Sequence, residues 1–162
     1  MLITLIILFL MLSALFSGTE IAYISASKLR VELKKKKGAR RGQILAGFYE
    51  DPAGFLGTML VGNNIALVVF TTLITRLIEP SLLQVPFFQA PLALLLTETV
   101  LATIILLLFG EFLPKTLFRL YADDALYLFA YPLKVLQWLL LVPSWIMTRL
   151  SNLLLRILRT PT

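Results

Sequence analysis

The sequence predicts an all-α membrane protein with three transmembrane helices and further helices at the membrane surface. Hydrophobic residues fill 59% of the 162 positions and only 15% are charged, with a mean hydropathy of +0.89, which is far outside the soluble range. Three apolar segments are each long enough to cross about 30 Å of hydrocarbon. Eight of the fifteen Lys and Arg residues lie between the first two segments, in residues 28–41, so the net charge of +6 indicates topology rather than nucleic-acid binding.

The first expected span covers residues 2–26 and contains a single charge, Glu20. A signal peptide is the alternative, because an apolar run ends near small residues. However, the basic start typical of signal peptides is missing and apolar sequence continues beyond Glu20. These features favour a span that is retained.

The second and third spans are expected over residues 52–78 and 92–118. Cytoplasmic loops are rich in Lys and Arg, so the loop 27–51 should be cytoplasmic, whereas the loop 79–91 has three prolines and neither Lys nor Arg. Three crossings would place the N-terminus outside and the C-terminus in the cytoplasm.

The segment 125–159 is the most ambiguous part of the chain. Its hydropathy allows a fourth span, but Pro132, Lys134 and Pro143 interrupt it and its end is basic. From Trp145 onward the polar and apolar residues fall on opposite helical faces, which is typical of a helix at the membrane surface. We therefore expect an interfacial helical pair that contacts membrane lipid.

The motif GEFLPK, residues 110–115, places Glu111 inside a strongly apolar run. An ionisable residue within a span indicates a functional site, because burying a carboxylate in hydrocarbon is costly. In an α-helix Pro114 would also leave the carbonyl of Gly110 without its partner. A carboxylate and a free carbonyl suit a hard cation. The alternative is a kinked helix in which Glu111 pairs with Lys115 or Arg119.

The absence of Cys and His restricts the chemistry further. Disulfide, zinc, haem and iron–sulfur sites are unsupported. A metal site built from oxygen ligands favours Mg²⁺, Ca²⁺ or Na⁺. An enzyme is not expected, because Glu111 has no evident acid–base partner.

The polar residues of the three spans should meet at one depth. At 1.5 Å per residue, Ser17 lies roughly 14 Å, Asn63 about 15 Å and Glu111 roughly 10 Å from the cytoplasmic ends of their spans. A serine can instead bond its own helix backbone. Glycines that permit close helix approach adjoin all three, in the pairs Ser17-Gly18, Gly62-Asn63 and Gly110-Glu111.

Other polar residues are secondary candidates. Adjacent residues face different ways on a helix, so at most one of Asn63 and Asn64 is expected to be a ligand. Glu20 either adds a second charge near the site or extends toward the interface. Glu98 lies nearer the outer side, where it either pairs with Arg76 or takes part in transport.

These motifs together resemble the DUF21 transmembrane domain of the CorC/CNNM (cyclin M) family. The resemblance covers nearly the whole chain, including the basic loop and the stretches FSGTEIAYISASKLR, EDPAGFLGTMLVGNN and GEFLPK. It implies a homodimer with three spans and juxtamembrane helices per subunit. By matching motifs it implies ion-site positions at Ser17, Asn63, Gly110 and Glu111, with Glu20 and Asn64 less secure because the family varies there.

The resemblance implies export of Mg²⁺ across the plasma membrane, with Na⁺ exchanged for it. The alternative is a membrane-embedded Mg²⁺ sensor or regulatory dimerisation module that transports nothing itself. Longer family members continue into CBS domains and a CorC-type domain. The printed sequence stops at Thr162, so we expect an isolated membrane domain, a truncation of a longer protein, to which the nucleotide regulation of longer members is not carried over.

Overall fold

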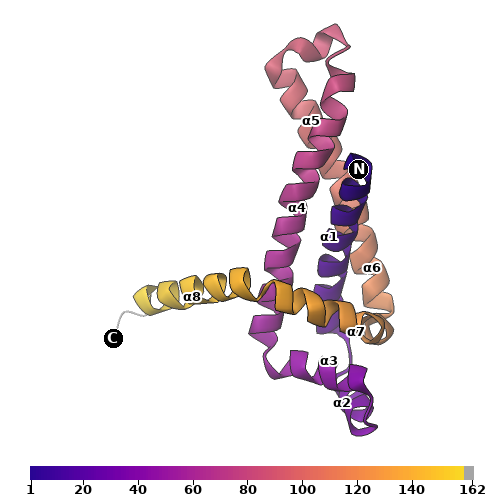
Figure 1. The fold of residues 1–162 in the computed structure, drawn as a ribbon, viewed down its shortest axis with the longest axis vertical. Helices are drawn as coiled ribbons and strands as arrows, with labels where there is room; N and C mark the ends of the chain where they lie inside the picture. The colour runs from indigo at the N-terminus through magenta and orange to yellow at the C-terminus, as the bar shows by residue number, and fades with distance from the viewer. Residues whose placement is uncertain (159–162) are drawn as a thin grey trace.

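The computed structural model describes residues 1–158, in which every regular element is a helix. Two single helices, α1 (Leu2–Ser25) and α4 (Pro52–Leu82), are long and apolar enough to cross a membrane, as is the composite run Pro91–Leu120. In Figure 1 these three elements run roughly alongside one another. The prediction of an all-α fold with three transmembrane helices is confirmed, and the chain is a multi-pass membrane protein.

The third span consists of three segments. The helix α5 (Pro91–Ile105) continues into the π-helical turn η2 (Leu106–Phe112), and α6 (Leu113–Leu120) completes the crossing. The N–H of Leu113 donates to the carbonyl of Leu108, five residues earlier, which is the π-helical register. The break from α-helical geometry therefore lies at the turn that carries Gly110 and Glu111.

The two expected loops contain more helix than the sequence suggested. The basic loop 27–51 forms two helices, α2 (Lys28–Lys36) and α3 (Arg40–Glu50), because Val31, Leu45 and Phe48 are buried against the rest of the domain. On the other side α4 continues to Leu82 with Pro80 inside it, and a short 3₁₀ helix, η1 (Pro86–Gln89), precedes α5.

The C-terminal region forms α7 (Ala122–Leu139) and α8 (Leu141–Leu158). The two helices are bent by 66° relative to each other, and in Figure 1 they run across the three spans rather than along them. By length and composition the bent pair could also form a fourth, broken span, so the expected interfacial pair stays a prediction. Arg159 and Thr160 lie outside the described residues.

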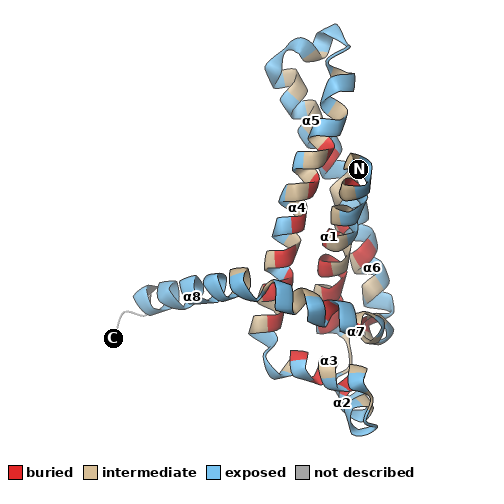
Figure 2. Cartoon of the chain, in the orientation of Figure 1, coloured by how far each residue is buried: buried red, intermediate tan, exposed pale blue. Residues whose placement is uncertain are grey.

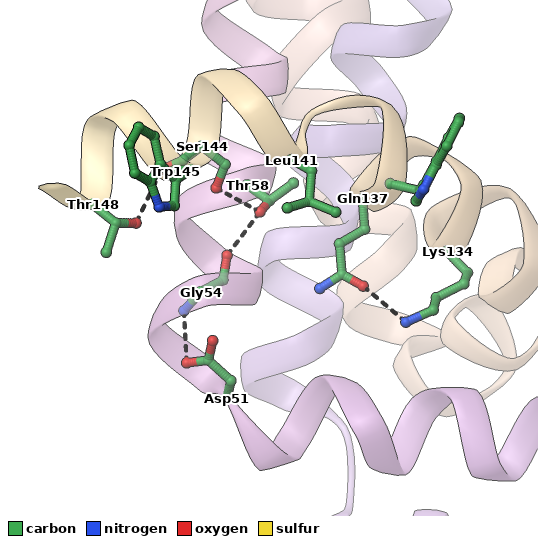
Figure 3. Close-up of a pocket in the computed structure, with 10 residues that line it drawn as sticks. Asp51, Gly54, Thr58, Lys134, Gln137, Leu141, Ser144, Trp145 and Thr148 are labelled. Carbon is green, nitrogen blue, oxygen red and sulfur yellow. Dashed lines mark hydrogen bonds between the residues drawn. The ribbon is translucent and has the colours of Figure 1, made fainter.

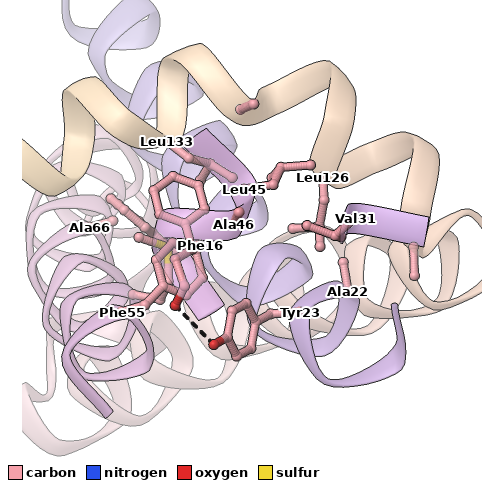
Figure 4. Close-up of a cluster of buried hydrophobic side chains, with 14 residues drawn as sticks. Phe16, Ala22, Tyr23, Val31, Leu45, Ala46, Phe55, Ala66, Leu126 and Leu133 are labelled. Carbon is pink, nitrogen blue, oxygen red and sulfur yellow. Dashed lines mark hydrogen bonds between the residues drawn. The ribbon is translucent and has the colours of Figure 1, made fainter. Parts of the chain in front are cut away.

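The main core lies where α1, α3, α4 and α7 meet. Its largest fully buried side chains include Phe48, Phe55 and Leu133, and Figure 4 shows this cluster. Tyr23 of α1 donates a hydrogen bond of 3.0 Å to the carbonyl of Phe48 and stacks on Tyr49 with ring centroids 4.3 Å apart. These contacts attach α3 firmly to the first span.

The half of the domain that carries η1 and α5 and the far end of α8 are much less buried. Figure 2 shows α5 and α8 mostly exposed. In the most apolar stretch of the third span only 6% of the residues are buried inside the chain, against 33% in the corresponding stretch of each of the other two spans. The third span thus has a large apolar surface for lipid or another subunit.

Asp123 fixes the start of α7 to the junction of α1 and α2. Its carboxylate accepts hydrogen bonds of 2.9 Å from the backbone N–H of Ser27 and from the guanidinium of Arg30. The ammonium of Lys34 also lies 4.2 Å from the ring centroid of Tyr127 on α7, a cation–π contact. The basic segment is therefore partly used to hold α7 in place.

Candidate functional site

The polar contact between the first two spans joins Ser13 of α1 to Asn63 of α4. The hydroxyl of Ser13, which is fully buried, donates to the side-chain oxygen of Asn63 at 2.8 Å. Gly110 of the third span lies against the same point, since a methyl group added to it would come within 3.3 Å of that hydroxyl. The structure therefore brings all three spans together at Ser13, Asn63 and Gly110.

Ser13 was missed by the sequence reasoning, although a signal for it was present. It precedes Ser17 by four residues, and residues four apart share a helix face. Asn63 thus meets α1 at Ser13, one turn nearer the N-terminus than the expected residue Ser17.

Ser17 lies one helical turn from Ser13 on α1. Its side chain is 1% exposed, and its hydroxyl has no hydrogen-bond partner among the described residues. The alternative in which it bonds its own helix backbone is therefore not what the structure shows. A buried hydroxyl left without a partner costs about 1–3 kcal/mol, so an unsatisfied group of this kind calls for an ion, water or functional explanation.

Glu111 follows Gly110 on the π-helical turn and pairs with Lys115. The carboxylate lies 3.9 Å from the ammonium, and the side chain of Glu111 is 30% exposed. Within residues 1–158 no hydrogen bond joins Glu111 to Ser13, Ser17 or Asn63. The ion-pair alternative is thus the arrangement seen here.

The π-helical register changes the expectation for the carbonyl of Gly110. That expectation assumed α-helical geometry, in which Pro114 would face Gly110. At the end of η2 the N–H of Leu113 meets the carbonyl five residues earlier, and in that register the missing N–H of Pro114 corresponds to the carbonyl of Phe109 instead. The carbonyl that faces the missing N–H of Pro114 is therefore that of Phe109 rather than that of Gly110.

Close packing surrounds the site because glycines face bulky side chains. A methyl group on Gly62 would come within 2.5 Å of the ring of Phe16, and one on Gly18 within 2.7 Å of the ring of Phe118. Both aromatic rings lie against helix backbone as a result. The glycines next to the candidate residues thus serve helix approach, as the pattern predicted.

The secondary candidates lie away from this meeting point or form other contacts. The amide of Asn64 donates to the carbonyl of Leu60 at 2.9 Å and is exposed, so the two adjacent Asn side chains do face different ways. Glu20 is half-buried and takes part in none of the ion pairs of the described chain. The described residues also contain no ion pair between Glu98 and Arg76, and one carboxylate oxygen of Glu98 is buried without a partner.

The site is therefore poor in charge and rich in neutral oxygen atoms. Among residues 1–158 no group of three or more acidic, His or Cys side chains is arranged to hold a metal ion. Ser13, Ser17 and Asn63 offer two hydroxyls and one amide oxygen, and the carboxylate on the adjoining turn is that of Glu111. Such a donor set is compatible with weak, reversible binding of a hard cation that keeps part of its water.

Comparison with known proteins identifies relatives along nearly the whole chain. The UPF0053 inner membrane protein YfjD of Escherichia coli is 27% identical over 151 residues, which cover 93% of this chain and 33% of YfjD. A UPF0053 protein of Haemophilus influenzae is 26% identical over 94% of this chain and 34% of its own length. A UPF0053 protein of Synechocystis is 32% identical over 68% of this chain and 26% of its own length. The chain thus spans about a third of the first two relatives.

One described protein family matches almost the whole chain. Residues 4–162 match the cyclin M transmembrane N-terminal domain, so the match includes all three spans, the basic helices and the pair α7 and α8. The glycine-flanked polar residues and the GEFLPK turn lie within it. The chain belongs to the cyclin M transmembrane N-terminal domain family.

Proposed function

We propose that this domain exports Mg²⁺ from the cytoplasm across the bacterial inner membrane, with Na⁺ entering in exchange. Family membership points to a role related to Mg²⁺ transport. The observation that carries the proposal is the buried contact between Ser13 and Asn63 beside Gly110, with the unpartnered hydroxyl of Ser17 one turn away. It offers a dehydrated cation neutral oxygen atoms inside the spans.

Glu111 supplies the charge in this proposal and Lys115 competes for it. With no ion bound, the ammonium 3.9 Å away neutralises the carboxylate. When Mg²⁺ arrives, Glu111 leaves Lys115 and turns toward the hydroxyls and the amide oxygen. Mg²⁺ gives up its water reluctantly, so one carboxylate with neutral oxygens binds it modestly and releases it readily, as transport requires.

Coupling to Na⁺ follows from the energetics of moving a dication outward. Moving one elementary positive charge outward against an inside-negative potential costs about 2.3 kcal/mol per 100 mV, so export of one Mg²⁺ costs about 4.6 kcal/mol at 100 mV. Entry of Na⁺ down its gradient supplies energy of this order. A site whose single carboxylate serves one ion at a time suits exchange.

Flux through proteoliposomes that contain only this protein tests the proposed function. We expect Mg²⁺ to move across the vesicle membrane, and to move faster when a Na⁺ gradient drives Na⁺ in the opposite direction. The Mg²⁺ flux should fall when Ser17 is changed to Ala. Mg²⁺ binding without any flux would support the alternative, a membrane-embedded Mg²⁺ sensor or dimerisation module. Flux that ignores the Na⁺ gradient would remove the exchange part of the proposal.

The proposed orientation has its own test. We expect single cysteines replacing Lys36 on α2 and Ser151 on α8 to react with a membrane-impermeant maleimide from the cytoplasmic side only, because both helices belong to the basic, membrane-surface part of the chain. The chain has no native cysteine to interfere. Labelling of position 151 from outside would show that α7 and α8 together cross the membrane.

We also propose that the domain is a homodimer. Only 6% of the residues in the most apolar stretch of the third span are buried within one chain. The exposed surface of this span is apolar, which leaves room for a second copy. In a mild detergent, light scattering coupled to gel filtration should give twice the mass of one chain. A monodisperse monomer that still binds Mg²⁺ would show that the site is complete without a partner.

A further inference from the structure

A cavity of about 390 Å³ opens below the bend between α7 and α8, beside the first two turns of α4. Figure 3 shows residues from these three elements around it. Thr58 of α4 and Ser144 of α8 bridge one side with their hydroxyls 2.9 Å apart. The cavity is separate from the candidate cation site and lies in the size range of ligand pockets.

The cavity has one group of each charge. Asp51 caps α4 by accepting the backbone N–H of Gly54 at 3.0 Å, and Lys134 of α7 contacts only the amide oxygen of Gln137, at 3.5 Å, among the described residues. Neither charge belongs to an ion pair within residues 1–158. The lining is therefore neutral overall, with an ammonium and a carboxylate both free to receive a ligand.

Both tryptophans of the chain line the same cavity. Trp138 on α7 is 70% exposed and Trp145 on α8 is 56% exposed. Tryptophan concentrates at the headgroup level of membranes, where its ring meets both apolar and polar surroundings. Asp51 immediately precedes the start of a span, which places the cavity at that same level.

We propose that this cavity binds the headgroup of a phospholipid that carries both a phosphate and a primary ammonium, as phosphatidylethanolamine does. Lys134 receives the phosphate and Asp51 the ammonium, while the acyl chains extend past the two tryptophans. A purely anionic headgroup would leave Asp51 unpaired and repelled. A trimethylated headgroup has no N–H to donate to Asp51, so the primary amine is the recognised feature.

The proposal is tested by native mass spectrometry of the delipidated protein with added lipids. We expect phosphatidylethanolamine to bind about tenfold more tightly than phosphatidylcholine or phosphatidylglycerol, because one charge-assisted hydrogen bond is at stake. Asp51→Asn should bring phosphatidylethanolamine and phosphatidylcholine close to equal affinity. Asn caps helices as well as Asp does, so this variant keeps α4 intact.

Matched variants separate the cavity from general attraction to lipid. Lys134→Gln should weaken phosphatidylethanolamine and phosphatidylcholine alike, whereas Lys36→Gln removes the same charge from exposed α2 and should change neither. Unchanged selectivity in Asp51→Asn, or equal binding of phosphatidylglycerol to the unaltered protein, would overturn the proposal. Soluble glycerophosphoethanolamine that competes as well as the lipid would show that the ligand is not a membrane lipid.

Discussion

Glu111→Gln is expected to abolish most of the thermal stabilisation that Mg²⁺ gives the protein. The amide keeps the size of the side chain and removes the negative charge that offsets dehydration of a dication. At a Mg²⁺ concentration of 100 times the dissociation constant, binding stabilises the native state by about 2.7 kcal/mol, and a 100-fold loss of affinity reduces this to about 0.4 kcal/mol. Melting curves with and without Mg²⁺ measure the difference.

Three comparisons make the result specific. Glu98→Gln removes a carboxylate from the outer part of the third span and should leave Mg²⁺ binding nearly intact. Ser17→Ala and Asn63→Ala each remove one neutral oxygen and should weaken binding less than Glu111→Gln. If Glu98→Gln abolishes binding while Glu111→Gln does not, the cation site lies on the other side of the membrane.

Lys115→Gln provides the complementary test of the competition between cations. Removing the ammonium frees the carboxylate of Glu111, so Mg²⁺ affinity should rise rather than fall. An unchanged affinity would mean that the ion pair at 3.9 Å has no influence on the site. The two substitutions therefore move the same measurement in opposite directions.

Gly42→Ala is expected to have the largest effect on stability outside the spans. A methyl group there would come within 2.7 Å of the carbonyl carbon of Lys34 and 2.8 Å of the amide nitrogen of Lys35. These are backbone atoms, which cannot rotate away, so α2 and α3 must separate. Forcing extra volume into packed structure costs about 1–3 kcal/mol, which should lower the unfolding temperature in detergent.

Gly47→Ala on the same helix is the matched control. A methyl group at position 47 meets nothing within 4 Å, and alanine favours a helix over glycine by about 1 kcal/mol. This variant should therefore unfold at the same or a higher temperature. If both variants unfold at the same temperature, the close approach of α3 to α2 does not contribute to stability.

The spans could be predicted from the sequence because hydropathy over many residues is a strong signal. The helices α2 and α3 were missed because the high charge of their segment concealed a few buried positions, such as Val31 and Phe48. Their burial depends on packing against α7, which lies far away in the chain. No local pattern carries that information.

The candidate site was only partly predictable for a related reason. Counting residues placed Ser17, Asn63 and Glu111 at one level, whereas the structure brings Ser13, Asn63 and Gly110 together. Ser13 was missed because its partner lies fifty residues away, and the spacing to Ser17 was the available signal. The π-helical turn also escaped prediction, because Pro114 was assumed to interrupt an α-helix.

That π-helical turn sets the rotational phase of the third span. Ala102 packs with Ile6 in one cluster, and Gly110 and Phe118 also face α1. Along an uninterrupted α-helix the sixteen residues from Ala102 to Phe118 would leave the two ends roughly 160° out of phase. The wider turn corrects this rotation, so one strip of the helix follows α1 along its whole length.

Chain length in this turn therefore matters as much as composition. Deleting one residue between Leu106 and Phe112 would let a plain α-helix run through with its two ends still in phase, whereas adding one would rotate everything after it by about 100°. Phe118 would then leave Gly18, although Ala102 stayed against Ile6. The rotational phase of α6 relative to α5 is thus set by the number of residues in this turn.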